Sequence, residues 1–164
     1  MGPVDQEKRE VNNGVLVYTS EPLAEPIWLI GDVTATIYAA TTAVDTDYAV
    51  RLCVVDRSGV STNIQEGIIR ARYRESLSNP SLLEPNTIYR YEIEVGPVGV
   101  KLDTGERIRV QVTSTDFPQC DRNLNTGNSP SSEGLADSLV ATQAIFHDEE
   151  HPSSINLPVW KPEG

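Results

Sequence analysis

The sequence predicts an all-β protein, built as an antiparallel β-sandwich or jelly roll. Two observations lead to this class. About nine or ten short apolar or alternating stretches follow one another at roughly regular spacing, separated by turns rich in Gly, Pro and Asp. No stretch keeps the longer period that an amphipathic helix requires. Many short strands with frequent turns are typical of sandwiches and jelly rolls.

Each expected strand is placed by its pattern. Residues 33–40 alternate most cleanly, which assigns the odd-numbered residues of this stretch to one face of a sheet. Residues 31–32, Gly-Asp, are expected to end the strand before it, and turn signals at 56–59 and 103–105 separate later strands. The expected strands are 14–19, 26–30, 33–40, 47–55, 66–75, 87–95, 106–114, 139–147 and 155–160.

Residues 66–75, EGIIRARYRE, allow a choice between two periods. As a strand, the segment puts its apolar residues on one face and its arginines on the other. As a helix, it would spread the arginines over most of the circumference and interrupt the apolar stripe, so we expect a strand. The ladder of Arg70, Arg72 and Arg74 is then either a solvated face or a docking surface for an acidic neighbour, because Arg suits interface pairing.

The length of 164 residues suits one domain with a sizeable core. We expect this domain at 14–160, after a flexible polar lead-in at 1–13 and before a short tail at 161–164. Two cysteines, Cys53 and Cys120, are too few for a disulfide framework. The favoured interpretation is two reduced thiols in a cytoplasmic protein, although a single bridge stays open.

The composition argues against two classes of partner. The formal net charge is −11, whereas nucleic acids and anionic membranes both attract a positive field. No apolar run approaches the ~18 residues of a membrane helix, and the first ten residues lack the apolar core of a signal peptide. We therefore expect no nucleic-acid partner and no membrane partner.

The chain offers little catalytic chemistry. A serine hydrolase of the α/β class places its nucleophile in a G-x-S-x-G turn beside a histidine, and this chain has no such turn. Its two histidines, His147 and His151, match the zinc motif H-x-x-E-H. That motif belongs on a helix, whereas this pair lies between two expected strands and directly precedes Pro152. A polar link between strands is the favoured interpretation.

Several aspartates flank the expected strands, which raises the question of structural calcium. They do not form an ordered series of ligands such as D-x-D-x-D, so solvated or turn-capping side chains are favoured. We expect no metal and no cofactor. The aspartates considered are Asp45, Asp47, Asp56, Asp116 and Asp121.

The stretch 110–127, VQVTSTDFPQCDRNLNTG, is the strongest candidate for a functional surface. It begins as an alternating strand and stops at Phe117–Pro118, because Pro cannot donate to a sheet ladder. A loop dense in Asp, Arg, Asn and Gly follows, in which Asn123 and Asn125 are expected to make turns. Loops of this kind, delivered by a buried strand, commonly carry sites and interfaces on β scaffolds. A short helical turn is possible at 129–135.

The amino-acid sequences of three segments resemble one family. VDTDYAVRL (44–52), ARYRESL (71–77) and STDFPQCDRNLNTG (114–127) occur in the order found in the carboxy-terminal β domain of the CocE/NonD hydrolases, the cocaine-esterase and X-Pro dipeptidyl-peptidase type. The resemblance extends over nearly the whole chain. It departs at Cys120, where the family leads us to expect an aromatic residue.

This resemblance implies an all-β, galactose-binding-like jelly roll that packs against an α/β-hydrolase domain. Members of the family carry a Ser-Asp-His triad in the hydrolase domain, upstream of the part that this chain resembles, so no catalytic residue carries over to it. Members also begin the jelly roll earlier, so we expect this chain to be truncated on its N-terminal side. Missing strands would leave open sheet edges, which predicts a homo-oligomer.

The expected function is therefore that of a non-catalytic domain of a serine hydrolase that cleaves acyl esters or X-Pro peptides. It would stabilise the hydrolase domain, help to form the substrate pocket and be inactive alone. The alternative is a free-standing module that binds carbohydrate or protein, for which few exposed aromatic residues are available. The expected interdomain interface comprises Arg70, Arg72, Arg74, Asp116, Phe117, Pro118, Asp121, Arg122 and Asn123.

Overall fold

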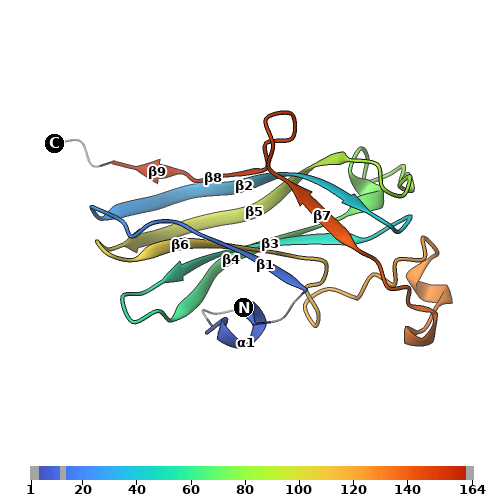
Figure 1. Ribbon diagram of the computed structural model, residues 1–164, viewed down its shortest axis with the longest axis horizontal. Helices are drawn as coiled ribbons and strands as arrows, with labels where there is room; N and C mark the ends of the chain where they lie inside the picture. Colours follow the sequence, from blue (N-terminus) through green and yellow to red (C-terminus); the bar gives the residue numbers. More distant parts are fainter. Residues whose placement is uncertain (1–3, 12–13, 162–164) are drawn as a thin grey trace.

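The computed structural model describes residues 4–11 and 14–161 and contains two antiparallel sheets packed face to face (Figure 1). The predicted all-β sandwich is confirmed. The strands are β1 (Val15–Thr19), β2 (Ile27–Thr41), β3 (Asp47–Val55), β4 (Ser61–Arg70), β5 (Tyr89–Leu102), β6 (Arg107–Thr113), β7 (Gln143–Phe146), β8 (Ser154–Asn156) and β9 (Val159–Trp160). The helical segments are α1 (Glu7–Glu10) and three 3₁₀ turns, η1 (Ala71–Tyr73), η2 (Pro130–Ser132) and η3 (Leu135–Asp137).

Strand order differs between the two sheets. The first sheet runs β1-β6-β3-β4. In the second sheet, β2 pairs with β5 on one side and with β7, β8 and β9 in succession on the other. All of these pairings are antiparallel, and β2 is the long strand on which the second sheet is built.

The core lies between the sheets and is made by alternate residues of the central strands. Val33, Ala35 and Ile37 of β2 are buried, as their alternation predicts. Tyr48 of β3 and Tyr91 of β5 face each other across the core, with ring centroids 4.8 Å apart. The buried apolar residues also include Leu29, Ala39, Val50, Leu52, Ala71, Leu83, Ile93, Val95, Leu102 and Val112.

Two predicted strand boundaries are wrong. The second and third expected strands are one strand, because β2 continues through Gly31 and Asp32 while β5 pairs with it from Ile27 to Ala39. Gly31 adopts φ 131°, a value that glycine tolerates, and a bulge between Val33 and Thr34 absorbs the irregularity. A continuous partner strand therefore overrides the local turn signal. The expected turns at 56–59 and 103–105 are confirmed, with Gly59 at φ 93° and Gly105 at φ 85°.

The expected strand at 66–75 is only partly correct. β4 ends at Arg70, and Ala71–Tyr73 forms a 3₁₀ turn instead. The chain leaves the sheet there because the Ala71 amide donates to the carbonyl of Thr46, and the Arg72 amide donates to the carboxylate of Asp45. The one-sided arginine ladder therefore does not form. The short helical turn that is possible at 129–135 is present as η2, and a second turn, η3, follows it.

Residues 4–11 of the expected lead-in contact the first sheet. Here α1 covers part of the first sheet, the Gln6 amide donates to the carbonyl of Ser61 (2.8 Å), and Glu10 forms an ion pair with Arg109 (2.5 Å). Residues 1–3 and 12–13 of the lead-in, and 162–164 of the expected tail, lie outside the described residues. None of the helices in the described residues is long and apolar enough to cross a membrane.

Gly67 sets how closely β4 approaches β5. A Cβ atom at this position would lie 2.2 Å from the Glu94 carbonyl oxygen and 2.7 Å from the Val95 Cα. Both obstacles are backbone atoms, so neither can move aside without displacing β5. The two sheets are therefore closed against each other along the β4–β5 side of the sandwich.

We predict that Gly67→Ala lowers the free energy of unfolding by about 2–3 kcal/mol, the cost of overpacking a close contact. Urea denaturation measures the change. Gly99→Ala is the matched control, because Gly99 also lies in a strand but has no atom within 4 Å of the added Cβ. Equal stability of the two variants would contradict the predicted contact.

Candidate functional site

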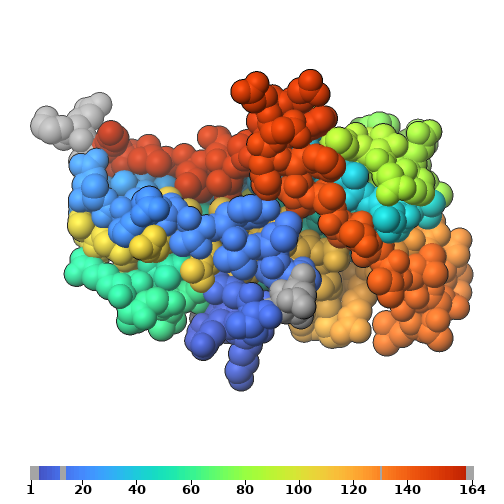
Figure 2. Space-filling view, in the orientation of Figure 1, coloured from blue at the N-terminus to red at the C-terminus, as the bar shows by residue number. Residues whose placement is uncertain are grey.

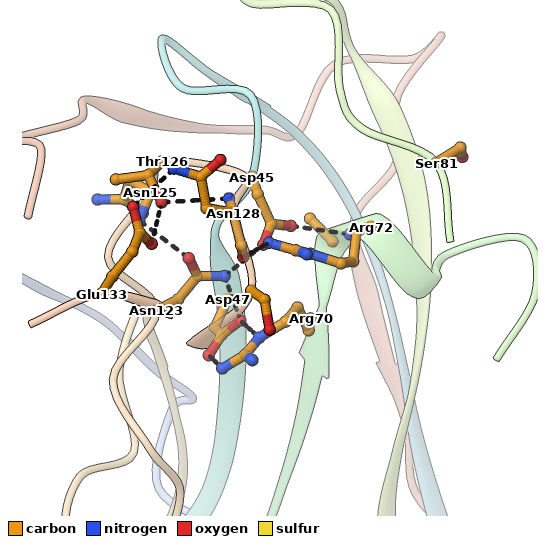
Figure 3. A network of polar contacts seen from close by, with 12 residues as sticks. Asp45, Asp47, Arg70, Arg72, Ser81, Asn123, Asn125, Thr126, Asn128 and Glu133 are labelled. Atoms are coloured by element: carbon orange, nitrogen blue, oxygen red, sulfur yellow. Dashed lines mark hydrogen bonds and ion pairs between the residues drawn. The ribbon is translucent and has the colours of Figure 1, made fainter. Parts of the chain in front are cut away.

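Residues of the stretch 110–127, the predicted functional surface, border a cavity of about 430 Å³ at one corner of the sandwich. The cavity lies where the end of β4 meets the loop that follows β6, and its polar framework is drawn in Figure 3. We call it the corner cavity. Its lining residues are Arg70, Arg72, Phe117, Asp121, Arg122, Asn123, Leu124, Thr126, Asn128, Glu133, Gly134 and Leu135.

Two buried carboxylates support the corner cavity. Asp45 is fully buried and accepts from the amide and guanidinium of Arg72, with Nε at 2.8 Å. Asp47 accepts from Nε and Nη2 of Arg70, at 2.9 and 3.1 Å. The side-chain amide of Asn123 donates to both carboxylates at 2.8 Å (Figure 3). The favoured interpretation, solvated or turn-capping aspartates, is thus wrong at these two positions, because each buried charge has a cationic partner.

The same two arginines hold the loop. Nη2 of Arg70 donates to the carbonyl of Asp121 (3.3 Å), and Nη2 of Arg72 donates to that of Asn128 (3.1 Å). The backbone amide of Asn125 donates to the side-chain oxygen of Asn123 (2.9 Å), and Asn125 itself adopts φ 62°. The predicted turn-forming role of these two asparagines is confirmed. The loop is therefore held by hydrogen bonds from two arginines, which are themselves held by their ion pairs with Asp47 and Asp45.

The outer rim of the corner cavity is exposed. Phe117 is 50% exposed, and the Arg122 guanidinium lies over its ring at 4.2 Å from the centroid. Leu135, from the 3₁₀ turn η3, is 66% exposed. The rim therefore presents an aromatic ring, a stacked guanidinium and an aliphatic side chain. The backbone beneath the rim is held by the Arg70–Asp47 and Arg72–Asp45 ion pairs.

Six of the nine expected interface residues line the corner cavity and three do not. Arg74 donates to the carbonyls of Ala71 and Ser81 and lies over the ring of Tyr89. Asp116 is buried beside Arg51, whereas Pro118 is exposed and follows a cis peptide bond. The structure thus gathers most of the predicted set in one place, and its role as an interface stays a prediction.

Asp116 belongs to a second polar network, on the outer face of the first sheet. The buried Arg51 donates to Asp116 (2.8 Å) and to Glu66 (2.6 Å). Burial, together with the charge of Glu66, raises the pKa of Asp116, although Arg51 opposes the shift. Cys53 is also buried, and burial raises the pKa of its thiol to about 12. Such a thiol stays protonated at neutral pH, which makes it a poor nucleophile.

The two histidines contact a tyrosine and an aspartate rather than a serine or cysteine nucleophile. His147 Nε2 is 2.8 Å from the Tyr18 hydroxyl, and His151 Nδ1 is 2.9 Å from Asp148. Within 4–11 and 14–161, no cluster of three or more His, Cys, Asp or Glu side chains is placed to hold a metal ion.

Sequence reasoning missed two kinds of residue at this site. It did not identify Asp45 and Asp47 as partners of the arginines, although D-x-D and R-x-R share the same spacing in strands that form a hairpin. It also missed Glu133 and Leu135, which reach the cavity through the folding of a long loop. No local sequence pattern indicates that Glu133 and Leu135 belong to the cavity.

We predict that Asp45→Ala lowers the free energy of unfolding by about 2–3 kcal/mol, because it removes a buried carboxylate that accepts charge-assisted hydrogen bonds from the half-buried Arg72 and a further bond from Asn123. Asp121→Ala should change stability by less than about 0.5 kcal/mol, since that side chain is exposed. Urea denaturation of both variants tests the ion pairs. A similarly small effect of the Asp45 substitution would show that the pairs contribute nothing.

Comparisons with known proteins agree with the fold. A protein-family model, described as the X-Pro dipeptidyl-peptidase C-terminal non-catalytic domain, matches residues 3–156 of this chain. The cocaine esterase of Rhodococcus sp. (strain MB1 Bresler) is 39% identical over 160 residues, which are 98% of this chain and 28% of that protein.

Two solved structures share the fold at higher than 25% identity. An α-amino acid ester hydrolase is 32% identical with a TM-score of 0.89, over 95% of this chain and 27% of that one. An aminopeptidase from the marine sediment archaeon Thaumarchaeota archaeon is 30% identical with a TM-score of 0.88, over 96% of this chain and 27% of that one. This chain therefore spans about a quarter of the length of these relatives. Its fold and a family match over almost its whole length show that it belongs to the X-Pro dipeptidyl-peptidase C-terminal non-catalytic domain family, the carboxy-terminal domain of the CocE/NonD hydrolases.

Proposed function

We propose that this chain is the non-catalytic domain of a serine hydrolase of the acyl-ester or X-Pro dipeptidyl-peptidase class. In that enzyme it stabilises the α/β-hydrolase domain and helps to form the substrate pocket. The observation that carries the proposal is the match of residues 3–156 to a domain family described as non-catalytic. The relatives named as a cocaine esterase, an ester hydrolase and an aminopeptidase are each about four times as long as the matched part.

The rim of the corner cavity suits the contact with the hydrolase domain. Aromatic residues and Arg are enriched in interfaces and supply much of their binding energy. Phe117 and Arg122 provide such side chains and Leu135 adds an aliphatic one, and the ion pairs beneath them hold the backbone in place before binding. A surface that is already ordered loses less conformational entropy when it binds.

We predict that this chain raises the melting temperature and the ester-hydrolysing activity of a separately produced triad-bearing hydrolase domain from the same enzyme. The double variant Phe117→Asp, Leu135→Asp should weaken this docking about tenfold or more, because it places two charges in an apolar contact. Calorimetric titration and hydrolysis of a nitrophenyl ester measure the two effects.

Leu77→Asp is the matched control, because Leu77 is 86% exposed and does not line the corner cavity. Docking that is unaffected by the double variant would reject the corner as the interface. Absence of any gain in stability or activity with the unaltered chain would reject the proposed function itself.

We also propose that the chain self-associates through the outer edge of β1. In the described residues this strand pairs with β6 alone, and Leu16 and Tyr18 are exposed on it. An unpaired strand edge can accept a strand from a second copy. This proposal retains the expected homo-oligomer.

We predict that the mass measured by light scattering rises above that of one chain as the protein concentration increases. Leu16→Lys should return the mass toward one chain, because a charged edge opposes strand pairing. Val60→Lys, at another exposed apolar position, should leave the mass unchanged. A single-chain mass for the unaltered protein at every concentration would contradict self-association.

A further inference from the structure

The two sheets are not closed along the side opposite Gly67. Two adjoining cavities, of about 310 and 240 Å³, lie between β1 and β6 of the first sheet and β7 of the second. Both are lined by Val112 and Ile145, so the two cavities meet at these side chains, and we call them together the inter-sheet groove. Figure 2 shows the blue N-terminal strand bordering the red C-terminal segments on the face toward the viewer.

The middle of the inter-sheet groove is apolar. Ile37, Val50 and Val110 line the smaller cavity together with the two shared residues. At its mouth the Tyr18 hydroxyl and His147 Nε2 approach to 2.8 Å, which links β1 to the end of β7. This part of the groove therefore suits an apolar body that is shielded from water.

The larger cavity has polar atoms without partners. Tyr48 lines it and is 1% exposed, and its buried hydroxyl has no hydrogen-bond partner. Gln143 also lines it, and its Oε1 is buried without a partner, while its Nε2 donates to the Thr46 hydroxyl (3.0 Å). Leaving such groups unpaired is costly. Each of the two atoms has almost no accessible surface, so a bound molecule gains a hydrogen bond there once the side chain turns toward the cavity.

The charge of the groove restricts what it can hold. Among the described residues, the side chains lining the larger cavity include no Asp, Glu, Lys, Arg or His. Those lining the smaller cavity include one ionisable base, His147, which contacts Tyr18. An ionised ligand would lose its hydration without gaining a counter-charge, and the net charge of −11 further opposes an anion.

We propose that the inter-sheet groove binds a small neutral amphiphile. An aryl or alkyl body lies along Val112 and Ile145, and a hydroxyl or amide group at its end bonds to the Tyr48 hydroxyl and to Gln143 Oε1. A group that both donates and accepts has the chemistry to pair with either atom. The cavity volumes suit a molecule at the lower end of the size range of small-molecule ligands. The proposal concerns this chain alone and does not depend on the proposed function.

The test is a nuclear magnetic resonance titration of the full chain, at low protein concentration, with 3-phenylpropan-1-ol and with 3-phenylpropanoate. The two probes share one skeleton and differ in charge. We expect saturable shifts of the amide signals of Val112, Gln143 and Ile145 with the alcohol. The carboxylate should bind at least tenfold more weakly.

Two tyrosine substitutions make a matched pair. Tyr48→Phe should weaken binding of the alcohol about fivefold, the effect of one hydrogen bond. Tyr91→Phe should leave binding unchanged, because the Tyr91 hydroxyl is also buried without a partner but does not line the groove. Ala141→Phe, in the segment before β7, should block binding by filling the larger cavity.

Thermal melts confirm first that each variant is folded. The proposal is overturned if the alcohol causes no saturable shifts, or if the shifts fall mainly on exposed apolar residues away from the groove. Equal binding of the two probes would reject the proposed neutrality of the site. Equal effects of the two tyrosine substitutions would reject the hydrogen bond to Tyr48.

Discussion

The pairing of two buried carboxylates with two arginines is the interaction on which the structure around the corner cavity depends. Asp47 is the first residue of β3 and Asp45 lies just before that strand, and both are away from water, so their charges must be balanced within the protein. Arg70 does so from the end of β4, and Arg72 does so from the turn that follows. The chain leaves the sheet between them because Arg72 must reach Asp45 with both its amide and its guanidinium.

These ion pairs also determine the shape of the surface above them. The remaining N–H groups of the arginines bind carbonyls of the loop after β6, and Asn123 connects both carboxylates to that loop. Charges inside the corner are thus neutralised, while Phe117, Arg122 and Leu135 remain at its rim. The arginines act by holding the loop, and the exposed residues are those available to a partner.

The two long sides of the sandwich have different properties for a simple steric reason. Gly67 allows the backbones of β4 and β5 to come together, and the sheets close along that side. On the opposite side β2 is paired in turn with three short strands, of which β7 lies across the inter-sheet groove from β1 and β6. That asymmetry gives a non-catalytic domain two distinct surfaces, a polar corner and an apolar groove.

Local pattern was a good guide to the strands and a poor guide to their ends. The alternation of 33–40 correctly predicted which residues enter the core, because a strand with one buried face must alternate. It could not show that β2 continues through Gly31, since that outcome depends on a partner strand more than sixty residues away. The resemblance of three ordered segments to one family was likewise sufficient to identify that family.

The sequence by itself determined the fold class, the alternating core and the residue types gathered at the corner. Only the tertiary structure decided that Arg70 and Arg72 are paired inside the protein rather than displayed as a ladder. It also brought Glu133 and Leu135 to the same cavity. The physical reason is that a buried charge pairs with an opposite charge that lies close to it in space. Strand alternation and residue spacing do not indicate which distant side chain occupies that position.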